Sequence, residues 1–483
     1  MMDWRPIMLV VGILLVILAV FMIPPMVADL AAGHPDWQVF LTSACLTLFT
    51  GVSLVLMNRA PGAADLTGRQ AFLLTTLVWV VLTFFAALPL QFSELELGLA
   101  DAVFEAMSGI TTTGSTVIVG LDSAPPGILL WRAILQWLGG IGIIVMGVAV
   151  LPILSVGGMQ LVRAESSDLS DKILPRAAQI ASGIGLIYLG LTLTCAIAYW
   201  SAGMASFDAA AHAMTTIATG GYSTSDGSIG HFANPSIEWI AVVFMVLGAL
   251  PFVLYIQFTN GQLGVPFRDS QVRWFLGIVG SATVLITFWL TLQSDLPPRD
   301  ALRSAAFNVI SVITGTGYAS TDYGLWGTFP VQVMFFLMCI GGCTGSTTGG
   351  IKVFRFSVLY AVASAQVARL IRPHSVVITT FNGRPLPQAA AVAVITFVFM
   401  FALCFSIGAL ALSAFGLDYL TAMSGSLTAL ANVGPGLGPE IGPSGNFSGL
   451  PDGAKWILSF AMLVGRLELF TVLILAAPGF WRA

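Results

Sequence analysis

The stretch DAVFEAMSGITTTGST, residues Asp101 to Thr116, is repeated in outline three more times along the chain. The other copies are DAAAHAMTTIATGGYST from Asp208, FNVISVITGTGYAST from Phe307 and MSGSLTALANVGPGLG from Met423. Each copy is a short, moderately apolar segment that ends in a turn rich in Thr, Asn and Gly, and each lies between longer apolar runs. The repeated unit is therefore a full span, a half-helix, a turn and a second full span.

The composition around these copies is that of a membrane protein. Of the 483 residues, 57% are hydrophobic and 9% are charged, whereas soluble proteins carry about 25% charged residues. Runs of about 20 apolar residues recur, and each can cross the hydrocarbon layer as a helix. We predict ten spans, of which the eighth is interrupted: 7–28, 37–57, 70–91, 130–155, 176–200, 236–259, 272–292, 330–364, 388–414 and 455–477.

The predicted fold is an all-α polytopic membrane protein. Two N-terminal helices precede four pseudo-repeats of helix, re-entrant pore helix, filter turn and helix, arranged around one central pore. The predicted boundaries are 1–60 for the N-terminal helix pair, then 61–160, 161–262, 263–372 and 373–483 for the four pore repeats.

Charge placement predicts the orientation. With the N-terminus in the cytoplasm, most Lys and Arg residues fall on the cytoplasmic side, as the positive-inside rule requires, and the C-terminus is cytoplasmic too. Most acidic residues then fall outside or in re-entrant segments, where they would concentrate cations, unless they merely reflect the bias of basic residues. The basic stretch from Lys352 to Arg384 is either an orientation signal or a docking site for a regulatory subunit.

The four turns are the candidate ion site. Backbone that is not helical is tolerated at membrane depth only where it is buried in protein or lines a water-filled cavity. Four turns around one axis would supply carbonyl oxygens that replace the hydration shell of a cation, and the half-helices would aim their negative ends at it. Glycine allows the necessary bends and close approaches. Aligned on one glycine, the turns are Thr111, Thr112, Thr113 and Gly114; Ala218, Thr219, Gly220 and Gly221; Thr314, Gly315, Thr316 and Gly317; and Ala431, Asn432, Val433 and Gly434.

The interruption in the eighth span is the candidate gate. Its glycines and small polar residues disfavour a helix and make alternative conformations accessible, although a static kink would have the same composition. A phosphate-binding loop is excluded, because Ile351 separates the last glycine from Lys352 and the flanks are membrane helix. The candidate gate residues are Gly341, Gly342, Cys343, Thr344, Gly345, Ser346, Thr347, Thr348, Gly349 and Gly350.

Several polar residues at membrane depth need partners. Arg466 and Glu468 are the charges deep in the last predicted span, and they point to different faces of a helix, so each needs a partner of its own. Glu105, His212 and Asn308 occupy the same place in three half-helices, five residues before the isoleucine that precedes each turn. We expect these three side chains to brace the turns.

The chain resembles the TrkH-like membrane subunit of Trk-type bacterial potassium transporters, within the Trk/Ktr/HKT superfamily. Besides the four turns, the resemblance rests on WLGGIGIIVMGVAVLPIL (137–154), GCTGSTTGGIKVFR (342–355) and VGRLELFT (464–471). It implies that glycine at the four aligned positions selects potassium, and that the interrupted span forms a loop under the filter with Arg466 facing the pore near it. It also implies a homodimer and a separate cytoplasmic ring of NAD- or ATP-binding regulatory domains, since this chain has no GxGxxG unit.

We therefore expect potassium uptake across the bacterial inner membrane, with K⁺ as the transported ion and no bound cofactor or nucleic acid. Nothing in the spans resembles a nucleophile–base pair or a carboxylate dyad, so we expect no enzyme. One alternative is a sodium- or proton-coupled potassium symporter, and a sodium-selective pore is a variant of the same architecture. A solute transporter built on inverted repeats would need two halves in opposite topology, whereas these units match in parallel.

Overall fold

The computed structural model describes residues 3–59, 67–149, 173–262, 264–294, 296–374, 378–382 and 384–482. Within these ranges the regular secondary structure is helical apart from one antiparallel ribbon, in which β1 (Thr380–Phe381) pairs with β2 (Arg384–Pro385). Eight helices are long and apolar enough to cross a membrane, or up to ten if each of two bent pairs is one span. The predicted all-α polytopic fold is confirmed.

Large apolar side chains cover the outside of the helix bundle. Phe49, Leu186 and Leu410 are each more than 70% exposed, and many other large hydrophobic residues are exposed as well. A soluble protein rarely exposes so many large apolar side chains, so lipid is the solvent that this surface fits.

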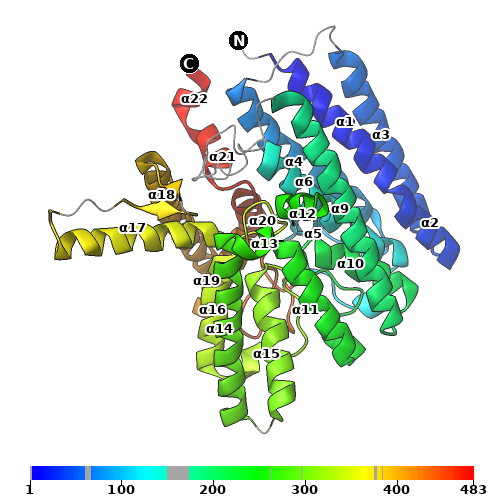
Figure 1. Ribbon diagram of the computed structural model, residues 1–483. Helices are drawn as coiled ribbons and strands as arrows, with labels where there is room; N and C mark the ends of the chain where they lie inside the picture. Colours follow the sequence, from blue (N-terminus) through cyan, green and yellow to red (C-terminus); the bar gives the residue numbers. More distant parts are fainter. Residues whose placement is uncertain are drawn as a thin grey trace.

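The N-terminal helices form a pair beside the first repeat (Figure 1). Helices α1 (Arg5–Phe21) and α2 (Ile23–Ala32) together make one span, and α3 (Trp37–Asn58) returns next to it. Gly12 and Gly51 face each other so closely that a Cβ on Gly12 would lie 2.8 Å from the carbonyl oxygen of Gly51. The backbones of α1 and α3 therefore touch at this pair.

The first two repeats follow the predicted order of helix, half-helix, turn and helix. The half-helices α5 and α10 each carry an aspartate in the first turn, Asp101 and Asp208. A negative charge there interacts favourably with the positive end of the helix dipole. The elements are α4 (Gly68–Phe92), α5 (Leu99–Ile110), η1 (Leu121–Ser123) and α6 (Pro126–Ala149), then α9 (Ile173–Ser201), α10 (Ser206–Ile217), η4 (Ser228–Phe232), α11 (Pro235–Ala249) and α12 (Phe252–Thr259).

The third and fourth repeats keep the same order. In Figure 1 helix α17 projects sideways from the bundle, and both termini lie at the end of the molecule opposite the α14–α15 connection. The elements are α13 (Val265–Arg268), α14 (Ser270–Gln293), α15 (Pro298–Ile313), η5 (Tyr323–Leu325), α16 (Thr328–Ile340) and α17 (Val353–Ile371), then α18 (Gln388–Ala414), α19 (Tyr419–Ala431), α20 (Asp452–Arg466), α21 (Phe470–Leu473), η6 (Ile474–Ala476) and α22 (Pro478–Arg482).

The interruption of the eighth span is confirmed, because α16 ends at Ile340 and α17 begins at Val353. Two spans predicted as continuous, 236–259 and 455–477, are wrong in that respect. Helices α11 and α12 meet at an angle of 92°, and α20 meets α21 and η6 at 107°. Pro251 caps α12 and cannot donate a backbone hydrogen bond, which explains the first bend. At the second bend, Glu468 and Leu469 both have left-handed backbone conformations.

The predicted repeat boundaries remain a prediction, and the end of the span 130–155 lies partly outside the described residues.

Candidate functional site

The four half-helices bring their C-terminal ends into the interior. Almost every residue in the last two turns of α5, α10, α15 and α19 is buried, including the polar ones. Each helix then passes into its turn with the same backbone geometry, in which the second and fourth residues are left-handed. The second residues are Thr112, Thr219, Gly315 and Asn432, with φ between 49° and 69°, and the fourth are Gly114, Gly221, Gly317 and Gly434, with φ between 75° and 112°.

The four turns close into a ring. A Cβ added to an aligned glycine would point at a carbonyl oxygen of another repeat. In each case that oxygen belongs to the residue just before the other repeat's own aligned glycine. The contacts run from the first repeat to the second, then the third, the fourth and back to the first. They join Gly114 with the oxygen of Gly220, Gly221 with that of Thr316, Gly317 with that of Val433, and Gly434 with that of Thr113. The turns therefore share one axis, and a side chain at Gly114, Gly221 or Gly317 would overlap a neighbouring oxygen.

Side chains join the two ends of this ring. Ser115 donates a hydrogen bond from Oγ to the carbonyl oxygen of Gly434 at 2.7 Å. Asn432 donates from Nδ2 to Oγ1 of Thr113 at 2.9 Å. The fourth repeat is thus fastened to the first across more than 300 residues of sequence.

Many carbonyl oxygens of the ring have no donor. Within the described residues, the carbonyl oxygens of Thr112, Thr113, Thr316, Asn432 and Val433 accept no hydrogen bond, although each of these residues is at most 2% exposed. Buried carbonyl groups in proteins are almost always paired. A group of unpaired, buried oxygens that converge from several segments suits a cation that exchanges water for protein oxygen.

Side-chain ligands do not offer another cation site in the part of the chain that the structure describes. No group of three or more His, Cys, Asp or Glu residues there could hold a metal ion. The ring itself offers a cation its unpaired backbone carbonyls and the unpaired side-chain oxygens of Thr112 and Asn432. The hard alkali and alkaline-earth cations prefer oxygen ligands.

The three polar residues predicted to brace the turns all contact the chain that follows their own turn. A carboxylate oxygen of Glu105 accepts from the amide of Val117 at 2.9 Å. Nε2 of His212 lies 2.9 Å from Oγ of Ser223. Asn308 donates from Nδ2 to Oγ of Ser320 at 3.0 Å. One side chain in each of these half-helices thus fixes the extended segment on the far side of the turn.

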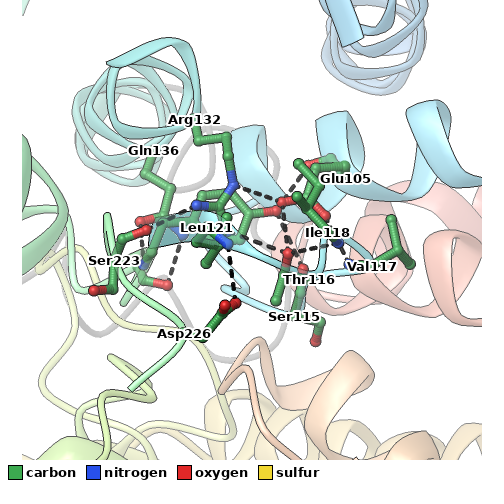
Figure 2. A network of polar contacts seen from close by, with 12 residues as sticks. Glu105, Ser115, Thr116, Val117, Ile118, Leu121, Arg132, Gln136, Ser223 and Asp226 are labelled. Carbon is green, nitrogen blue, oxygen red and sulfur yellow. Dashed lines mark hydrogen bonds and ion pairs between the residues drawn. The ribbon is translucent and has the colours of Figure 1, made fainter. Parts of the chain in front are cut away.

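A buried ion pair lies behind the first two turns (Figure 2). Nε of Arg132 lies 2.8 Å from Oε1 of Glu105, and both side chains are at most 1% exposed. Arg132 also donates to the carbonyl oxygen of Ser223 at 2.8 Å, and its guanidinium stacks on the ring of Tyr222 at 4.0 Å. Sequence reasoning missed this role of Arg132. The available signal was its position inside the predicted span 130–155.

The candidate gate is a buried loop against the ring. All residues from Gly341 to Gly349 are buried. Oγ1 of Thr347 lies 3.2 Å from the carbonyl oxygen of Ile217 and 3.0 Å from that of Gly248, and it can donate to either. Oγ1 of Thr219 donates to Oγ1 of Thr347 at 2.9 Å. A Cβ on Gly349 would overlap the carbonyl oxygen of Ala431. The loop therefore lies at the end of the ring where the half-helices enter the second and fourth turns.

Arg466 reaches this loop from the last residue of α20. Its Nη1 donates to the carbonyl oxygen of Thr347 at 2.9 Å, and the residue is 2% exposed. Its Nε and Nη2 are buried and have no hydrogen-bond partner among the described residues. Arg466 and the loop, predicted separately from the sequence, are thus in direct contact.

Glu468 has different partners from Arg466. This is expected, because residues two positions apart point to different faces of a helix. It pairs with Lys352, at 3.2 Å between Nζ and Oε1, and with the guanidinium of Arg355. Lys352 and Arg355 are at most 5% exposed. These two cations, at the start of the basic stretch, are therefore engaged inside the protein. The role of the stretch from Lys352 to Arg384, as an orientation signal or as a docking site, stays a prediction.

The fold and the site together define a polytopic α-helical membrane protein in which four buried turns close into a ring and a glycine-rich loop between two helices lies against that ring.

Comparisons with known proteins place the chain in a family. It belongs to the TrkH family of cation transport proteins, whose family model matches residues 36–482. The Trk system potassium uptake protein TrkI of Halomonas elongata is 47% identical over 99% of this chain and 97% of that protein. The Trk system potassium uptake protein TrkH of Escherichia coli is 40% identical over the whole of both chains. The crystal structure of the potassium transporter TrkH from Vibrio parahaemolyticus covers both chains completely, with a TM-score of 0.92 and 38% identity.

Proposed function

We propose that this protein takes up potassium across the bacterial inner membrane through the ring formed by its four turns. The observation that carries the proposal is the closed cycle of contacts between the aligned glycines and the carbonyl oxygens of neighbouring turns. The names of the similar proteins, which are potassium uptake proteins at 40 to 47% identity, support the choice of ion.

The proposed chemistry is the exchange of water for carbonyl oxygen. An ion that leaves water without compensation in a low-dielectric medium faces a cost of tens of kcal/mol. The unpaired oxygens of Thr112, Thr113, Thr316, Asn432 and Val433 would replace the lost water. The C-terminal ends of four half-helices would add about −0.5 charge each and repel anions.

The loop from Gly341 to Gly350 is the proposed gate. It fills the space beside the second and fourth turns, where an ion that leaves the ring would pass. Positive φ angles at Gly341, Gly345 and Gly350 let the loop adopt a compact shape that other residues would strain. Arg466 would hold the loop in place and oppose the passage of a cation.

A channel-like pore is favoured over a proton-coupled symporter, which is the second candidate. Coupling to protons needs an acidic or basic group that is free to titrate along the path. Two buried carboxylates beside the ring and the loop, Glu105 and Glu468, are each held by a cationic partner. We therefore assign them to structure.

Several further assignments belong to the same proposal. The protein would act as a homodimer, with both termini in the cytoplasm, and a separate NAD- or ATP-binding ring would control the loop. K⁺ would be its transported ion, with no resident cofactor and no nucleic-acid partner, and it would catalyse no covalent reaction.

Rubidium uptake into proteoliposomes tests the proposal. With the purified protein, we expect uptake that depends on the rubidium gradient and continues without sodium and without a proton gradient. Uptake that requires either gradient would favour the symporter. Uptake of sodium in preference to rubidium would overturn the choice of ion.

A further inference from the structure

The four turns of the ring are not held alike, and the difference is centred on Gln136. This residue is fully buried on α6, one helical turn after Arg132. Its Nε2 donates to the carbonyl oxygen of Gly220 at 2.6 Å, and its Oε1 accepts from the amide of Tyr222 at 3.0 Å. A single side chain of the first repeat therefore holds two backbone groups of the second turn, on either side of the aligned glycine.

The oxygen held by Gln136 is one of four equivalent oxygens. The residues that precede the aligned glycines are Thr113, Gly220, Thr316 and Val433, and their oxygens make the contacts that close the ring. Within the described residues, only the oxygen of Gly220 has a hydrogen-bond donor. One of the four oxygens is thus fixed by a side chain, whereas the other three can shift toward a bound ion.

Corresponding positions in other repeats explain this difference. Gly139, Gly248 and Gly465 lie against the carbonyl oxygens of Ile110, Ile217 and Leu430, the residues that directly precede three of the turns. Counting three residues back from each glycine gives Gln136, Met245 and Met462, all fully buried. Methionine cannot donate a hydrogen bond. Among these three repeats, only the first has a glutamine at this place, and that glutamine acts on the second turn.

The surroundings leave Gln136 no freedom to choose another partner. A Cβ on Gly220 would overlap the amide group of Gln136, so the side chain and the turn are in direct contact. Arg132 on the same face of α6 holds the carbonyl oxygen of Ser223, and Tyr222 reaches back with its hydroxyl to the carbonyl oxygens of Glu105 and Ser115. Figure 2 shows Arg132 and Gln136 extending together toward this segment.

We propose that Gln136 is a positioning residue that sets ion selectivity, because it fixes the Gly220 oxygen and so limits how far the ring can contract around a smaller ion. This inference rests on the proposed function of the ring. It assigns to one repeat a task that the four aligned glycines alone do not perform.

The test replaces Gln136 with the residue type of the equivalent positions. Q136M keeps an unbranched side chain of similar length and removes both hydrogen bonds. In proteoliposomes we expect the rubidium-to-sodium uptake ratio to fall about 3- to 10-fold, a change of the size of one net hydrogen-bond contribution. Rubidium uptake itself should change much less than the ratio. Q136L is measured in parallel, so that the result does not depend on the folding of one variant.

Two further variants separate the possible outcomes. M245L changes a buried side chain at an equivalent position without changing any hydrogen bond, and its ratio should equal that of the wild type. A folded Q136M or Q136L protein with the wild-type ratio, or with reduced uptake at an unchanged ratio, would overturn the assignment of Gln136. G114S tests the ring itself: if G114S changes the ratio and Q136M does not, only this inference fails. If neither changes it, the proposed function of the ring fails as well.

Discussion

Arg466, at the end of α20, donates a hydrogen bond from Nη1 to the carbonyl oxygen of Thr347, with 2.9 Å between the two atoms. The contact joins the second helix of the fourth repeat to the interruption in the third. Thr347 in turn touches the second turn of the ring through Thr219. A displacement of the loop must therefore break a charge-assisted hydrogen bond as well as contacts to the ring.

We expect R466Q to increase rubidium leak. A hydrogen bond from a charged group contributes about 1.5 to 3 kcal/mol, which corresponds to a shift of about 10- to 100-fold in the population of an open loop. The measurement is rubidium uptake by the purified protein without any added partner. R466K is the matched variant, and it should have an intermediate leak because lysine keeps the charge without the planar guanidinium. A tight R466Q protein that folds normally would contradict the role of Arg466 as a latch.

Glu468 is expected to contribute to stability more than to ion flux. E468Q would remove the carboxylate that pairs with the buried cations Lys352 and Arg355, and breaking a buried ion pair in this way costs about 3 to 5 kcal/mol. Thermal unfolding in detergent should show a clearly lower midpoint. D452N is the control, because Asp452 is 76% exposed and its pair with Lys455 is long, at 4.0 Å between Nζ and Oδ1. Its loss should therefore cost little stability. An E468Q protein as stable as D452N would contradict the buried triad.

The repeated turns and the interrupted span could be predicted because their signals are local. Four Thr- and Gly-rich turns in the same frame of apolar runs are visible in one sequence, and so is a glycine-rich break in a span. The bend at Pro251 also had a local signal, which the prediction of a continuous span overlooked.

The other features depend on contacts between distant parts of the chain. No proline occurs between Asp452 and Ala477, and the bend at Glu468 and Leu469 accompanies the pairing of Glu468 with Lys352 and Arg355, more than 100 residues earlier. The sequence near Arg132 and Gln136 gives no local signal of their partners. These partners lie in the second turn and the segment after it, which the closed ring brings beside α6. Such partners follow from closure of the ring and not from periodicity.

The Arg132–Glu105 pair makes a different prediction, because Arg132 holds two repeats together. R132M should destabilise the protein by about 3 to 5 kcal/mol, since Glu105 would remain buried without a cation. Adding E105Q removes that uncompensated charge, so the double variant should be more stable than R132M alone. Thermal unfolding of the wild type, both single variants and the double variant measures the coupling. Purely additive effects would contradict a direct interaction.

The aligned glycines provide the sharpest test of the ring, because the chain contains glycines with the same backbone geometry and no crowding. Gly114 has φ +88° and its Cβ would overlap the carbonyl oxygen of Gly220, whereas Gly261 has φ +89° and no atom within 4 Å of the corresponding position. Alanine at either site meets the same backbone strain, of about 1 kcal/mol.

G114A must also displace an oxygen of the neighbouring turn, and we expect rubidium uptake to fall by a factor of about 100 or more, since small misplacements of the atoms that contact a bound group have effects of that order. G261A should lose little stability and keep its uptake. Equal uptake by the two variants, measured in proteoliposomes at matched protein content, would show that the crowding at Gly114 has no part in ion passage. Loss of uptake in both would assign the effect to backbone strain instead of to the ring.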